Sequence, residues 1–126
     1  MKRLGIIVGT EVGNEPAAVR QPAEYFGCQV VVKSLGRPDD CVKLLRGEDP
    51  LFNSLDSWVF SVHGDDEKFI LPELDSSIYQ ENEPRHPIGV QDLQVKITLN
   101  QQLILNTGCT LGGKPLAQLF ISGGAQ

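Results

Sequence analysis

The sequence predicts a three-layer α/β domain, in which an open sheet of about four mostly parallel strands carries helices on both faces. Short, continuous apolar runs rich in β-branched residues are typical of strands that a parallel sheet buries on both sides. Segments with helical signals separate these runs along the chain. Such alternation indicates parallel strands that are joined by helices.

The expected strands are four apolar runs, each followed by a polar or glycine-containing segment. They span residues 4–8, 28–33, 58–62 and 103–105. Asn14 and Pro16 suit the start of a helix after the first strand. We expect Pro22 to make that helix short or kinked. A second helix is expected to open at Pro38 and to stop at Gly47.

The second half of the chain has weaker signals. Residues 68–72 resemble a short edge strand, and the polar, proline-bearing residues 75–87 are expected to form a surface loop in which Glu83 is solvated. Residues 88–97 fit a helix, with an amphipathic strand as the alternative. A final helix is expected over 116–121.

Composition limits the classes of function. The 126 residues suit one domain, with 40% hydrophobic and 21% charged residues. The net charge of −5, without a basic run, argues against nucleic acid or an anionic membrane as partner. No apolar stretch reaches the ~20 residues that span a bilayer. Three irregularly spaced cysteines indicate a reduced, cytoplasmic setting without a disulfide framework or zinc ribbon. We expect no cofactor and no metal.

Two strand ends carry residues with reactive side chains. His63 and Gly64 follow the third apolar run, and Gly108 and Cys109 follow the fourth. Ligands of open parallel sheets gather at the carboxyl ends of the strands, so the two ends are expected to meet. A nearby histidine can hold a cysteine as the nucleophilic thiolate. The glycine-containing turns can point backbone N–H groups at a developing oxyanion.

Residues 58–64 and 103–109 form two motifs, an apolar run followed by His-Gly and an apolar run followed by small residues and Cys. The pair resembles the caspase-like cysteine peptidases, especially their CHAT and separase-type branch. The helix and Gly-Ala ending of residues 116–125 are similar to the CHAT pattern. The resemblance implies a caspase-like fold with His63 as general base or imidazolium partner and Cys109 as nucleophile. It also implies an oxyanion site at the N–H groups of Gly64 and Cys109, and a peptide or protein substrate.

The chain also departs from the patterns of this family. Thr107 stands where metacaspases carry an acidic residue, and the Gln-Ala pair of true caspases is absent, so neither a basic nor an aspartate P1 preference is implied. Caspase-like domains continue with further strands. Three expectations follow: the domain is truncated, it is an inactive relative, or a homodimer or a partner chain completes the sheet at its fourth-strand side.

Two other interpretations remain open. The same fold without activity would be a scaffold or interaction module. Alternatively, the loop that contains Thr10, Gly13 and Asn14 resembles the flavodoxin phosphate loop, which would make the chain an FMN- or nucleotide-binding protein. If the peptidase interpretation holds, Asp65 and Asp66 are candidates for orienting His63.

Overall fold

A computed structural model gives the fold of the chain. It describes residues 2–10, 12–65, 68–71, 74–81, 83–84, 97, 99, 102–106, 118 and 120–125. The strands are β1 (Arg3–Val8), β2 (Gln29–Ser34), β3 (Ser57–Ser61), β4 (Gly64–Asp65), β5 (Lys68–Phe69) and β6 (Leu103–Asn106). The helices are α1 (Glu15–Tyr25), α2 (Pro38–Leu45) and α3 (Pro50–Asn53). Gln118 and residues 120–122 are also helical.

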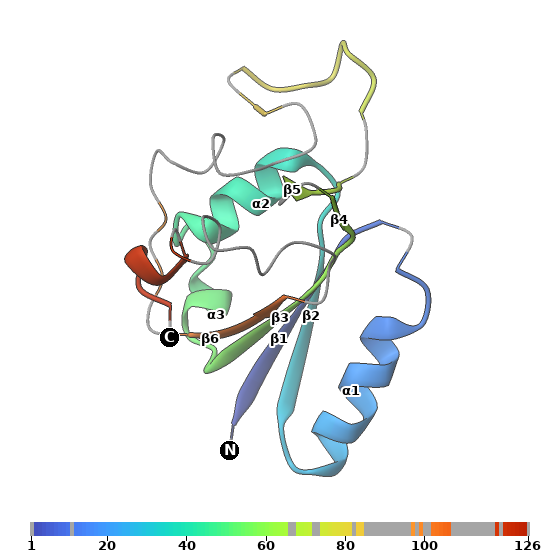
Figure 1. Cartoon of the computed structure of the whole chain (residues 1–126), viewed down its shortest axis with the longest axis vertical. Helices are drawn as coiled ribbons and strands as arrows, with labels where there is room; N and C mark the ends of the chain where they lie inside the picture. Colours follow the sequence, from blue (N-terminus) through green and yellow to red (C-terminus); the bar gives the residue numbers. More distant parts are fainter. Residues whose placement is uncertain are drawn as a thin grey trace.

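The main sheet has the strand order β2-β1-β3-β6, and all of its neighbouring strands are parallel. The connections through α1 and through α2 and α3 run in opposite directions across this sheet. Right-handed crossovers then require the helices to lie on opposite faces, and Figure 1 shows α1 on one side of the sheet with α2 and α3 on the other. The predicted α/β class and parallel sheet are confirmed.

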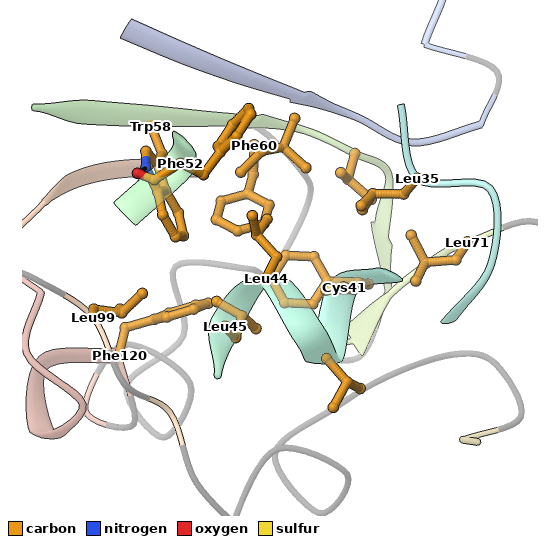
Figure 2. Packing of buried hydrophobic residues seen from close by; sticks show 14 of the residues in the cluster. Leu35, Cys41, Leu44, Leu45, Phe52, Trp58, Phe60, Leu71, Leu99 and Phe120 are labelled. Atoms are coloured by element: carbon orange, nitrogen blue, oxygen red, sulfur yellow. Dashed lines mark hydrogen bonds between the residues drawn. The ribbon is translucent and has the colours of Figure 1, made fainter. Parts of the chain in front are cut away.

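The hydrophobic core lies on the face covered by α2 and α3. Trp58 and Phe60 of β3 point toward the core, and aromatic contacts link them to Phe52, Phe69 and Phe120. Trp58 Nε1 donates a 2.9 Å hydrogen bond to the carbonyl of Phe52, which satisfies the buried indole. Figure 2 shows how α2 contributes Cys41, Leu44 and Leu45 to the same cluster.

Gly5 lets α3 approach the sheet closely. A Cβ atom at this position would lie 2.5 Å from Cε2 of Phe52 and 2.8 Å from Cδ1 of Leu55. Real side chains do not approach this closely, so the absence of a side chain on β1 lets the ring of Phe52 reach the sheet.

The opposite face of the sheet is only partly covered. No residue of α1 is buried, and Leu103 and Leu105 of β6 are 58% and 60% exposed. Their register places both on the face of Val59, beyond the reach of α1, which contacts β1 and β2. The prediction of a fourth strand buried on both faces was therefore wrong for these two leucines. The expected pairing of this edge with a second copy stays a prediction.

Three local features of the structure differ from what the sequence predicts. Helix α1 continues beyond Pro22 to Tyr25, because proline removes only one backbone donor and the N–H of Phe26 still reaches the carbonyl of Pro22 at 3.0 Å. The strand expected at 68–72 forms β5, which pairs antiparallel with β4 in a separate hairpin and is not an edge of the main sheet. The four-residue helix α3 was not predicted at all.

The predicted start and end of α2 are confirmed. Helix α2 begins at Pro38, and Gly47 follows it with a φ of 78°, a conformation that favours glycine after a helix. Cys28 and Cys41 are both free. Burial raises the pKa of the Cys41 thiol to about 12, so this cysteine is an inert part of the core. None of the described helices has the length and apolar character needed to cross a bilayer.

Candidate functional site

The side chain of His63 is exposed at the carboxyl end of β3. Its backbone belongs to the start of the β4–β5 hairpin, because its carbonyl accepts a 2.9 Å hydrogen bond from the N–H of Ile70. Before it, the N–H of Gly9 donates to the carbonyl of Ser61 at 2.9 Å. His63 therefore lies between two backbone attachments at the edge where ligands of parallel sheets gather.

Gly64 pairs with Phe69 in the hairpin. The bond from the N–H of Ile70 to the carbonyl of His63 makes Gly64–Phe69 a non-hydrogen-bonded pair of the antiparallel ladder. In such a pair the backbone N–H points away from the partner strand. The N–H of Gly64 is thus directed away from β5 and does not take part in the β4–β5 ladder.

Strand β6 runs parallel to β3 as its neighbour, and the last pair in their register is Phe60 with Asn106. Cys109 and Gly108, the other half of the expected site, lie outside the described residues, as does Asp66. The backbone of Asp65 belongs to β4. The structure thus shows that β3, which His63 follows, and β6, which precedes Cys109 in the chain, are neighbouring strands.

Asn106 has a feature that the sequence did not reveal. Its Oδ1 atom is buried and has no hydrogen-bond partner in the part of the chain that the structure describes. A buried acceptor without a partner costs roughly 1–3 kcal/mol, and such atoms are often found where a ligand or water binds. This acceptor lies at the carboxyl end of β6, three residues before Cys109.

The loop that resembles a phosphate-binding loop contains a carboxylate at its end. Gly13 has a φ of 61°, and Asn14 stands at the N-cap of α1 without a side-chain capping bond. The Glu15 carboxylate, in the first turn, accepts a 2.7 Å hydrogen bond from Ser61 Oγ. A negative charge at the helix N-terminus competes with a phosphate for the same N–H groups. This arrangement disfavours FMN or nucleotide binding at Thr10, Gly13 and Asn14.

An ion pair between Arg37, the N-cap residue of α2, and the buried side chain of Glu83 joins the start of α2 to the segment after the hairpin. Glu83, whose side chain is fully buried, accepts two 2.8 Å hydrogen bonds from Arg37, through Nε and Nη2. The backbone N–H groups of Asp39 and Gln80 also donate to it, at 2.9 and 2.8 Å. The hydrogen bonds from Arg37 lower the pKa of Glu83 to about 2. The expectation that Glu83 is solvated was wrong, because these four donors replace water.

The search for other sites and for relatives gives negative results. Within the described ranges, no group of three or more His, Cys, Asp and Glu side chains is arranged to hold a metal ion. Comparison of the chain with family models, with curated proteins and with solved structures finds no match.

Proposed function

We propose that this chain is a caspase-like cysteine peptidase domain of the CHAT or separase type, with His63 and Cys109 as its catalytic pair. The observation that carries the proposal is the β3–β6 register. His63 follows Phe60 by three residues, and Cys109 follows Asn106, the partner of Phe60, also by three. Because both residues lie three positions beyond the same strand pair, on parallel strands that are neighbours, we expect the imidazole of His63 and the thiol of Cys109 to lie close together.

The proposed reaction proceeds in two steps. The Cys109 thiolate attacks the carbonyl carbon of a peptide bond, the C–N bond breaks, and His63 gives its proton to the leaving amine. Water then attacks the thioester while His63 takes a proton from it, which releases the acid and restores the pair. The outward N–H of Gly64 suits the stabilisation of the oxyanion in both steps.

Selective alkylation of Cys109 tests the proposal. At about pH 6 an ordinary thiol with a pKa near 8.5 is ~0.3% thiolate, whereas a thiol paired with imidazolium is mostly thiolate. The lower intrinsic nucleophilicity of such a thiolate offsets part of this gain. We expect iodoacetamide to modify Cys109 about tenfold faster than Cys28, as measured by mass spectrometry of the cysteine peptides.

The chain supplies the controls for this experiment. His63→Ala is expected to slow the alkylation of Cys109 to the rate of Cys28. His86→Ala replaces the other histidine of the chain and is expected to leave the alkylation rate of Cys109 unchanged. Buried Cys41 reports any unfolding of the sample. If Cys109 is alkylated at the same rate as Cys28, and His63→Ala does not change that rate, the result would contradict the peptidase proposal and favour the inactive scaffold.

A further inference from the structure

The last residue of β3 is a buried serine with a charged partner. Ser61 is fully buried, and its Oγ donates a 2.7 Å hydrogen bond to Oε1 of Glu15, the first residue of α1. A buried hydroxyl needs such a partner, and bonds to a carboxylate are shorter and stronger than bonds between neutral groups. The bond links the start of α1 to the end of β3, 46 residues apart in the chain.

Backbone contacts hold the same point of the strand. The carbonyl of Ser61 accepts from the N–H of Gly9, and Gly9 packs so closely that a Cβ there would lie 2.9 Å from Cγ1 of Val62. Beyond this point, the hairpin holds the carbonyl of His63 through the N–H of Ile70. The backbone of His63 is thus restrained from both sides, and one of the restraints on the β3 side is the Glu15–Ser61 hydrogen bond.

We infer that Glu15 is a positioning residue for His63. It acts through Ser61, two residues before His63, and fixes the end of β3 from which the imidazole must reach Cys109. Small displacements of a reacting group have large effects on rate, so loss of this hydrogen bond weakens the pairing of imidazole and thiol. The inference rests on the proposed function, which assigns the catalytic role to His63.

The test is a set of substitutions in the hydrogen bond, measured by the rate of Cys109 alkylation at about pH 6. Glu15→Ala and Ser61→Ala are each expected to slow the reaction about fivefold, and the double variant is expected to be no slower than either one. Glu15→Gln keeps an acceptor oxygen and is expected to restore most of the rate. Glu24→Ala, which removes a carboxylate of the same helix that pairs with Arg20, is expected to react like the wild type.

A second readout is independent of the thiol. The chain has two histidines, so the His63 ring signals in an NMR spectrum are assigned by comparison with His86→Ala. Glu15→Ala and Ser61→Ala are expected to shift the His63 signals, and Glu24→Ala to leave them in place. Unchanged His63 signals in Glu15→Ala and Ser61→Ala would overturn the positioning role. So would a wild-type rate of Cys109 alkylation in these two variants, if His63→Ala slows the same reaction. Shifted signals without His63-dependent alkylation would support the positioning role and count only against the proposed peptidase.

Discussion

His63→Ala and Cys109→Ala are each expected to reduce peptide hydrolysis at least about 10³-fold, because nucleophile and base act as one unit. For the same reason, the double variant is expected to be no worse than either single one. The measurement is hydrolysis of a fluorogenic peptide library with a varied P1 residue, since the sequence does not imply a P1 preference.

Matched variants serve as controls for this loss of activity. Cys28→Ala and His86→Ala make the same chemical changes at residues that do not belong to the proposed pair, and both are expected to keep the wild-type rate. Hydrolysis that survives Cys109→Ala would contradict the mechanism, whichever peptide is cleaved. A wild-type chain that cleaves no peptide and has an ordinary Cys109 would favour the scaffold interpretation.

Arg37→Met is expected to have the largest effect on stability. It leaves the buried Glu83 carboxylate with backbone donors alone, so the free energy of unfolding near pH 7 is expected to fall by more than in Arg20→Met, whose ion pair is exposed on both sides. Urea unfolding measures the difference in unfolding free energy between the wild type and Arg37→Met. Arg20→Met breaks the exposed Arg20–Glu24 pair instead and is expected to cost about 0.5 kcal/mol or less.

The effect of Arg37→Met depends on pH. The folded-state pKa of Glu83 is lowered from 4.5 to about 2, so Glu83 contributes stability above about pH 4.5 that is lost as the pH falls toward 2. In Arg37→Met, the guanidinium group that favours the ionised form of Glu83 is absent. The difference in unfolding free energy between the wild type and Arg37→Met should therefore narrow as the pH falls from about 4.5 toward 2. A difference that stays constant over this range would contradict the role of the Glu83 charge.

The sequence predicts the parts of this fold that depend on local patterns. The apolar runs of β1 and β3 were recognisable as strands because parallel strands that are buried on both faces have continuous apolar sequences. The end of α2 was predictable from Gly47. Helix α3 was missed because four residues are too few for a helical period. Pro22 was expected to make α1 short or kinked, yet the helix continues through it to Tyr25.

The remaining errors concern contacts between distant residues. Leu103 and Leu105 belong to an apolar run, yet their exposure depends on how far α1 extends across the sheet. The burial of Glu83 depends on Arg37, 46 residues earlier in the chain, and no local sequence pattern predicts that these two residues pair. The hydrogen bond from Ser61 to Glu15 has the same separation. In the candidate site, the place of His63 after the end of β3 was predictable from the apolar run before it, whereas the restraints on its backbone required the tertiary structure.

The proposed catalytic pair requires residues 63 and 109 to face each other, and a disulfide between these two positions tests this arrangement. A His63→Cys variant is expected to form a bond to Cys109 under mild oxidation, because disulfides need Cα atoms about 4.4–6.8 Å apart, and neighbouring strands lie ~4.8 Å apart. Mass spectrometry of the unreduced digest identifies the linked peptides, and Cys28 serves as the competing thiol. A dominant 63–109 link is the predicted result. A folded variant in which residue 63 links to Cys28, or to nothing, would contradict the account.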